Sequence, residues 1–186
     1  MHRNALTALL HRYAVAWPSE TALVDRFLAF VRQHPDCLQR SCVPGHITAS
    51  AWILDAAGER ALLTHHKKLG RWLQLGGHVD GETAVERAAL REAQEESGMQ
   101  RLELQQWTRE LVPLDLDVHG IPARRDEPAH DHWDVRFWLQ AEPGQELVLS
   151  AESNDLRWFA EDELVTVTEE ESVLRLARKV RALRRG

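Results

Sequence analysis

The sequence is poor in cysteine and has no long apolar run. The first argues against a disulfide-stabilised protein, and the second against a membrane-spanning one. Its 2 cysteines, Cys37 and Cys42, supply no disulfide framework. They could pair with each other, but a reduced state in the cytosol is the better interpretation. No apolar run reaches ~18 residues, and no signal-peptide pattern is present. We therefore expect a soluble, cytoplasmic protein that does not use a membrane.

The sequence also lacks an excess of positive charge. It contains 23 lysines and arginines and 29 aspartates and glutamates, which gives a net charge of −6. This balance argues against non-specific nucleic-acid binding, so we expect no nucleic-acid partner. Amphipathic patterns at 4–16 and 19–33 predict two helices near the start of the chain. We expect residues 1–45 to form a helical extension and residues 46–186 to form the main domain.

The most informative stretch runs from Gly76 to Met99, with the sequence GGHVDGETAVERAALREAQEESGM. Its glycines predict a sharp turn in which the backbone approaches a neighbour closely. A helix is expected next, with Thr83 capping its start and Glu86 completing a capping box. Gly98 is a natural left-handed terminator. The stretch therefore predicts a glycine turn followed by a capped helix.

Three glutamates interrupt the apolar face of this helix. At ~100° per residue, Glu92, Glu95 and Glu96 continue the face that small apolar residues form in the first half. They repel one another and lie where the helix dipole disfavours negative charge. Mg²⁺ or Mn²⁺ would relieve this conflict, because both prefer hard oxygen ligands. Arg91, one turn before Glu95, can hold that carboxylate in place. The alternative is a solvated acidic helix end.

The same stretch resembles the Nudix box, G-x5-E-x7-R-E-U-x-E-E-x-G-U, in which U is aliphatic. The residues that match in register are Gly77, Arg91, Glu92, Glu95, Glu96, Gly98 and Met99. Thr83 departs from the pattern, because it stands where the box has its first glutamate. In the family that glutamate is more structural than metal-binding, so the departure weakens a fold contact more than the chemistry.

The resemblance implies an α/β (α+β) fold of the Nudix type, an α/β/α sandwich with a mixed sheet. It also implies metal-dependent hydrolysis of a phosphoanhydride in a nucleoside diphosphate linked to some group X, a small phosphorylated partner. The implied catalytic residues are Arg91, Glu92, Glu95 and Glu96. The implied metal ligands are Glu92, Glu95, Glu96, the Gly76 carbonyl and a loop acid, either Glu152 or, less favoured, Asp155. The base is left open among Glu92, Glu96 and the loop acid.

Two other functions fit a Nudix-like scaffold. A sensor would bind a nucleotide or metabolite without hydrolysing it, but the complete set of box carboxylates favours an enzyme. A prenyl diphosphate isomerase would need a catalytic cysteine, and Cys37 and Cys42 lie before the first core strand. The substrate stays open, because loops and pocket walls set specificity in such folds. A homodimer is a further expectation, since dimers are common among such proteins.

A second polar stretch lies at 115–139. A proline- and charge-rich loop is expected at 117–128, followed by an alternating strand at 130–139. One face of that strand carries His130, His132, Asp134, Arg136 and Trp138. This face resembles a pocket wall, and His130, His132 and Arg136 are the candidates for substrate binding. The two histidines could equally bind a metal, and the whole face could simply be the exposed polar side of a sheet.

The rest of the chain supplies one more candidate and the outline of the fold. Arg71 belongs to a basic loop before the glycine turn, which either contacts substrate phosphates or is merely solvated. Local patterns predict a hairpin of strands at 46–54 and 60–65, strands at 72–75, within 101–112 and at 146–149, and a C-terminal helix within 161–186.

Overall fold

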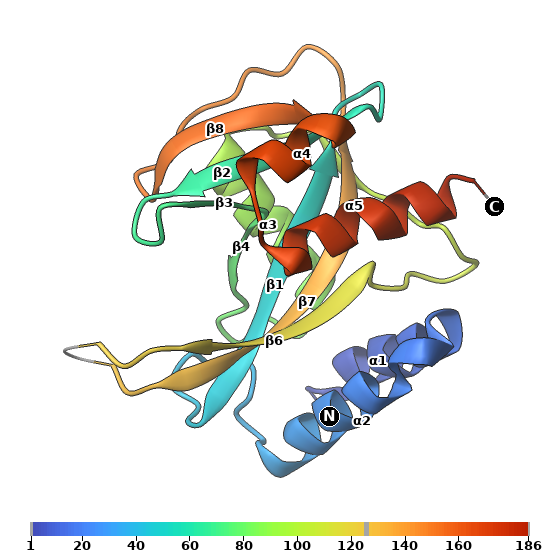
Figure 1. Ribbon diagram of the computed structural model, residues 1–186. Coiled ribbons are helices and arrows are strands. Elements are labelled where there is room, and N and C mark those ends of the chain that lie inside the picture. Colours follow the sequence, from blue (N-terminus) through green and yellow to red (C-terminus); the bar gives the residue numbers. More distant parts are fainter. Residues whose placement is uncertain (1, 125–126, 186) are drawn as a thin grey trace.

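The structure is a computed structural model that describes residues 2–124 and 127–185 (Figure 1). The helices are α1 (Asn4–Ala16), the short 3₁₀ helix η1 (Pro18–Glu20), α2 (Thr21–Gln33), α3 (Val85–Ser97), α4 (Glu161–Val167) and α5 (Glu171–Leu183). The strands are β1 (Gly45–Leu54), β2 (Arg60–His66), β3 (Arg71–Leu73), β4 (Leu75–His78), β5 (Leu102–Leu104), β6 (Asp115–Ile121), β7 (His130–Ala141) and β8 (Ser153–Ala160).

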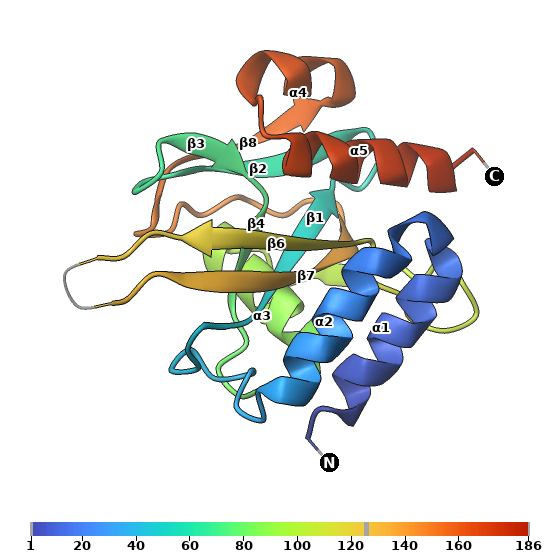
Figure 2. The same cartoon turned by 60° about the horizontal axis from the view of Figure 1, so that its bottom comes forward.

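The strands form a mixed sheet with β1 at its centre. β1 pairs in parallel with β7 over its whole length and antiparallel with β2 and β4. On one side β2 continues to β3 and β8, and on the other β7 continues to β5 and β6. Helices cover the sheet from two sides, with α4 and α5 on one and α1, α2 and α3 on the other (Figure 2). The predicted α/β/α sandwich with a mixed sheet is confirmed.

Alternation along β1 places apolar residues on one side of the sheet and, in the first half of the strand, polar residues on the other, before Trp52 and Leu54 join a second apolar core there. Ile47 and Ala49 are buried in the core that also contains Val85 of α3. Thr48 and Ser50 point the other way, and both hydroxyls donate to Asp134 on β7. The box helix α3 therefore packs on the apolar side, while polar groups gather on the opposite side.

The N-terminal helices α1 and α2 form close to the predicted bounds and share the core of the sheet. Phe30 of α2 stacks on Trp133 of β7 at 4.3 Å between ring centroids, and Phe27 meets the same ring edge-on at 5.1 Å. Such aromatic contacts add to the burial of apolar surface. None of the described helices is both long and apolar enough to cross a membrane.

Three predictions of secondary structure were wrong in detail. The strand β6 forms where a loop was expected from residue 117, although residues 125 and 126 of that loop lie outside the described part. No strand forms at 146–149, where the Val148 N–H instead donates to the Ser97 carbonyl at the end of α3. The single helix expected from residue 161 is divided, because the chain is extended at Thr168 between α4 and α5.

Candidate active site

Gly76 and Gly77 lie within strand β4, so the sharp turn predicted at these glycines is wrong, and they bring β4 into contact with β1 and α3. Gly76 pairs with Ser50 of β1, and a Cβ added at Gly76 would lie 2.3 Å from the Ser50 Cβ. A Cβ added at Gly77 would lie 2.5 Å from Oε2 of Glu92. Any larger residue would push one neighbour away. The close approach inferred from the glycines is thus present at the two positions nearest the glutamates.

The box helix begins one residue later than predicted and lacks the predicted cap. Ala84 is its N-cap and has no side-chain oxygen to offer, so Glu86 falls on the second helical position instead of the third. The capping box of Thr83 and Glu86 is therefore wrong. The expected terminator is confirmed, since Gly98 is left-handed with φ 76° and its N–H donates to the Gln94 carbonyl at 2.9 Å.

Arg91 connects the box helix to β4 and to two of its own carboxylates. Its guanidinium donates to Oε1 of Glu92 at 2.6 Å and lies 3.4 Å from Oε2 of Glu95. The other terminal nitrogen donates to the His78 carbonyl at 2.9 Å. The expected contact with Glu95 exists, but Glu92 is the closer partner. Arg91 thereby orients one carboxylate firmly and a second one loosely.

Glu96 is the most perturbed acid of the site. Its Oε2 accepts a hydrogen bond from the Gly76 N–H at 3.1 Å. Burial raises the pKa of Glu96 to about 7, and the neighbouring Glu92 and Glu152 push it in the same direction. Burial also raises the pKa of Glu92, although Arg91 opposes this change. Two half-buried carboxylates that lack enough positive charge thus lie one turn apart on α3.

Glu95 and Glu152 join Glu92 and Glu96 in one acidic group. Glu95 belongs to the same helix, and Glu152 comes from the loop before β8. The Glu95 side chain is 61% exposed at the solvent edge of the helix. Glu152 precedes β8, where its carbonyl accepts the Lys67 N–H at 3.0 Å, and its charge acts on Glu96. The alternative loop acid, Asp155, is already paired with Arg157 at 2.6 Å. The donors gathered here are all oxygens, which suits a hard cation such as Mg²⁺ or Mn²⁺.

The four predicted substrate-binding residues all lie apart from this acidic group. Arg136 is only 2% exposed, and its guanidinium donates to Asp134 at 2.8 Å and to Asp117 at 3.0 Å. Its donors are engaged within the protein, so the expected role of Arg136 in substrate binding does not fit. Arg71 is 65% exposed and pairs with Glu170, in the connection between α4 and α5. His130 and His132 lie at the start of β7, on the polar side of the sheet.

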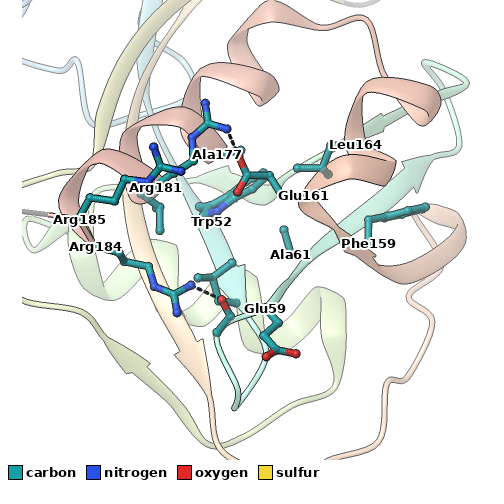
Figure 3. A pocket seen from close by; sticks show the side chains of 13 residues that line it. Trp52, Glu59, Ala61, Phe159, Glu161, Leu164, Ala177, Arg181, Arg184 and Arg185 are labelled. Atoms are coloured by element: carbon teal, nitrogen blue, oxygen red, sulfur yellow. Dashed lines mark hydrogen bonds and ion pairs between the residues drawn. The ribbon is translucent and has the colours of Figure 1, made fainter.

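A separate pocket lies between the β1–β2 hairpin and the C-terminal helices (Figure 3). Trp52, Phe159 and Leu164 form part of its wall. Arg181 at the rim is paired with Glu161 at 2.7 Å. None of the box glutamates lines this pocket, so we place the candidate active site at α3 and β4 instead.

Comparison with known proteins decides the family. A family model described as the NUDIX domain matches residues 44–180, which is most of the chain. The chain belongs to the Nudix family. Among solved structures, a Nudix hydrolase from Clostridium perfringens is 26% identical, with a TM-score of 0.58, over 75% of this chain and 96% of that one. A search of curated proteins finds no match.

Two further structures extend the comparison. A MutT Nudix hydrolase from Burkholderia pseudomallei is 26% identical, with a TM-score of 0.52, over 70% of this chain and 95% of that one. An Ap4A hydrolase from C. elegans shares the fold at 19% identity and a TM-score of 0.60, over 75% of this chain and 98% of that one. With its box carboxylates in place, this Nudix protein is a hydrolase of the pyrophosphohydrolase type.

Proposed function

We propose that this Nudix hydrolase uses Mg²⁺ or Mn²⁺ to cleave a phosphoanhydride bond in a nucleoside diphosphate linked to X, or in a related nucleotide. The observation that supports the proposal is the set of carboxylates on α3, of which Glu92 and Glu96 are half-buried with too little positive charge beside them. Burial raises the pKa of Glu96 to about 7, which marks a group whose environment lacks a cation. A polyphosphate substrate with its divalent cation supplies the missing positive charge at that place.

The carboxylates of Glu92, Glu95 and Glu96, with Glu152 and the Gly76 carbonyl beside them, would hold the cation. When bound, that ion would neutralise charge on the anhydride oxygens and polarise the phosphorus. Arg91 keeps the Glu92 carboxylate in one orientation through its 2.6 Å contact. The Gly76 N–H does the same for Glu96. The chain thus arranges its oxygen donors before any substrate arrives.

Glu96 is our candidate for the residue that takes the proton from the attacking water. The burial that raises the pKa of Glu96 in the metal-free protein makes its carboxylate a stronger proton acceptor, and a cation bound beside it would bring that pKa down again. The surrounding acids Glu92 and Glu152 stay within its electrostatic reach. They can stabilise the proton once it has been taken up.

A substrate panel tests this function. ADP-ribose, NADH, dinucleoside polyphosphates, CoA, nucleotide sugars and nucleoside triphosphates would be incubated with Mg²⁺, with Mn²⁺ and with EDTA, and release of phosphate, pyrophosphate or nucleotide would be measured. We expect turnover of one class, lost with EDTA and reduced about 10²–10⁴-fold in Glu96→Gln. Glu86→Gln, in the first turn of the same helix, is the matched control and should retain activity.

Two results would contradict the proposal. Turnover that persists in EDTA would remove the cation from the reaction. Near-normal turnover in a well-folded Glu96→Gln sample would remove Glu96 as the base. If no substrate is cleaved but one ligand raises the melting temperature in a metal-dependent way, the protein is a nucleotide- or metabolite-binding Nudix domain instead.

A further inference from the structure

A group of histidines lies on the opposite side of the sheet from the box glutamates. Gly77 faces Glu92, and the next residue, His78, points the other way, so that its ring centroid lies 5.0 Å from that of His46. His46 of β1 and His132 of β7 are register partners, with ring centroids 4.9 Å apart. His130 lies two residues before His132 on the same face. The group is therefore separate from the glutamate site.

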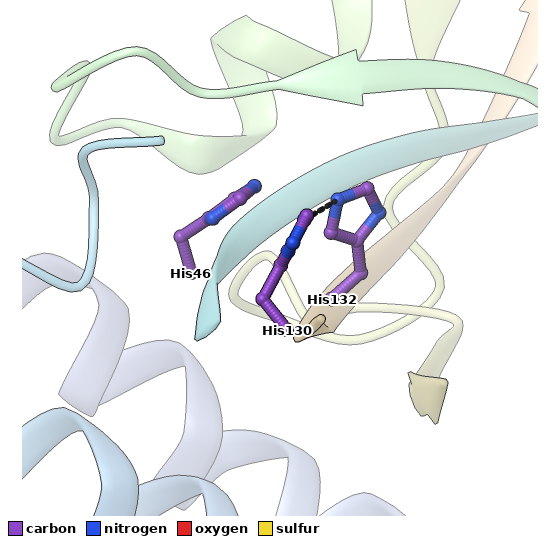
Figure 4. A group of neighbouring side chains, drawn as sticks. All are labelled: His46, His130 and His132. Atoms are coloured by element: carbon purple, nitrogen blue, oxygen red, sulfur yellow. Dashed lines mark hydrogen bonds between the residues drawn. The ribbon is translucent and has the colours of Figure 1, made fainter. Parts of the chain in front are cut away.

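Three of these histidines bring ring nitrogens close to one another. His46, His130 and His132 each offer a nitrogen, and the three nitrogens all lie within 4.8 Å of one another (Figure 4). The two Nε2 atoms of His130 and His132 are 3.3 Å apart. Nitrogen ligands at zinc distances in a tetrahedral site lie about 3.4 Å from each other. One edge of such a site is thus already in place, and a ring nitrogen of His46 lies within 4.8 Å of the other two ligand atoms.

The contacts of His130 assign its lone pair to Nε2, which lies 3.3 Å from Nε2 of His132 and 3.8 Å from Oε1 of Glu127. Its Nδ1 lies 2.9 Å from the Pro128 carbonyl, an acceptor that requires the proton on Nδ1. The lone pair is then on Nε2, which faces His132. A backbone carbonyl that fixes the tautomer of a histidine in this way is the usual outer contact of a metal ligand.

His46 supplies the second, independent observation. It is 1% exposed, and neither of its ring nitrogens has a hydrogen-bond partner in the described part of the chain. A buried nitrogen without a hydrogen-bond partner, within 4.8 Å of ring nitrogens of two other histidines, calls for a ligand.

We infer that His46, His130 and His132 bind a divalent transition metal of the Zn²⁺ type, at a site distinct from the magnesium or manganese site of the glutamates. Three imidazoles suit Zn²⁺, whereas carboxylates suit Mg²⁺. His78 and His119 flank the site, with ring centroids 5.4 Å from that of His132. The bound ion would join the starts of β1 and β7, the two parallel strands at the centre of the sheet.

Cobalt binding in excess magnesium tests this site without any measurement of activity. Tag-free protein would be stripped with EDTA, dialysed into excess Mg²⁺ to occupy the glutamates, and titrated with Co²⁺. We expect a visible absorption spectrum of a nitrogen-ligated cobalt ion that saturates at one equivalent and that Zn²⁺ displaces. His46→Gln and His132→Gln should lose it. His11→Gln, an exposed histidine on α1, and Glu96→Gln should keep it.

Absence of this spectrum in the wild-type protein, or its persistence in both cluster variants, would overturn the proposal. Should either variant fail to fold by circular dichroism, ¹⁵N spectra of the wild-type histidine rings give a second answer. Zinc must then shift the resonances of the three cluster imidazoles, including Nε2 of His130. Rings that do not respond to zinc would mean that the group is only a neutral hydrogen-bonded cluster.

Discussion

Two groups of charged residues lie on opposite sides of the central sheet, and they differ in how their charges are balanced. The balanced cluster lies on the polar side and consists of Arg136, Arg175, Lys179, Asp115, Asp117 and Asp134. Its acids all have cationic partners at 3.0 Å or less. The box glutamates, Glu92, Glu95 and Glu96, lie on the other side, where Arg91 is their cationic neighbour.

The two groups shift the pKa values of their acids in opposite directions. Burial acts to raise the pKa of Asp117, but contacts from His119, Arg136 and Arg175 hold it well below its usual range. Burial raises the pKa of Glu96 to about 7, because no cation opposes it. A buried acid with a partner is a structural feature, whereas a buried acid without one points to a missing ligand. The balanced cluster therefore contributes to the stability of the fold, and the box glutamates are the group suited to bind a cation.

Removal of the cation at the centre of the balanced cluster should have the largest effect. Arg136→Met would leave Asp134, Asp115 and Asp117 with fewer partners in a buried place, and we expect a loss of about 3–5 kcal/mol in the free energy of unfolding. Urea denaturation of the variant and the wild-type protein would measure it. A loss below about 1 kcal/mol would show that the cluster does not depend on its central guanidinium.

The pH dependence of stability should reveal the missing cation at Glu96. The folded pKa of about 7 exceeds the ordinary value of 4.5, so protonation of Glu96 favours the folded state. This contribution is complete below the unfolded pKa and is lost as the pH rises through about 7. We expect the difference in stability between metal-free wild type and Glu96→Gln to change by about 3 kcal/mol between pH 5 and pH 8.

Thermal melts in EDTA at several pH values would measure this difference. The comparison with Glu96→Gln cancels the titration of groups far from Glu96, such as the exposed histidines, which both proteins share. The variant should be the more stable of the two at pH 8, and added Mg²⁺ should reverse that order. A constant difference across the pH range would mean that Glu96 is not perturbed.

The two groups also differ in how far the sequence predicts them. The box glutamates lie within one helix, so periodicity and local spacing are enough to bring them together. The balanced cluster depends on β6 pairing with β7, which sets Asp115 opposite Arg136. The polar residues of β6 are typical of a loop when the sequence is read locally. Their partners lie on β7 and α5, so the strand cannot be recognised from its own segment. For the same reason, the sequence alone favours a substrate-binding role for Arg136.

The histidine group shows the same limit. His130 and His132 form a visible pair on one predicted strand, but His46 meets them only through the parallel pairing of β1 with β7. No local pattern indicates a contact between residues so distant in sequence. The N-terminal helices, the first hairpin and the box helix, by contrast, each follow from patterns within their own segments.

Arg91 offers a smaller and more specific test of the glutamate side. Arg91→Met would release Glu92 and Glu95 while leaving all the box carboxylates in place. We expect activity to fall about 10–100-fold and the Mg²⁺ concentration at half-maximal rate to rise, since Arg91 acts through the ligands that it orients. Arg87→Met, exposed on the same helix, is the matched control. An unchanged Mg²⁺ requirement would argue against this positioning role.

The smallest loss of stability should come from breaking an exposed ion pair. Its distance is similar to those of the balanced cluster, but its side chains are exposed to water. Arg101 contacts Glu142 at 2.8 Å, and both side chains are about half exposed. Water solvates either charge when the other is removed, so Arg101→Met should cost less than about 1 kcal/mol in urea denaturation. A loss as large as that of Arg136→Met would show that distance alone sets the strength of these pairs. The small loss expected here would mean that burial decides the effect, because a buried charge that loses its partner cannot be solvated by water. The stability of the protein would then depend on the pairs of the balanced cluster and not on those at the surface.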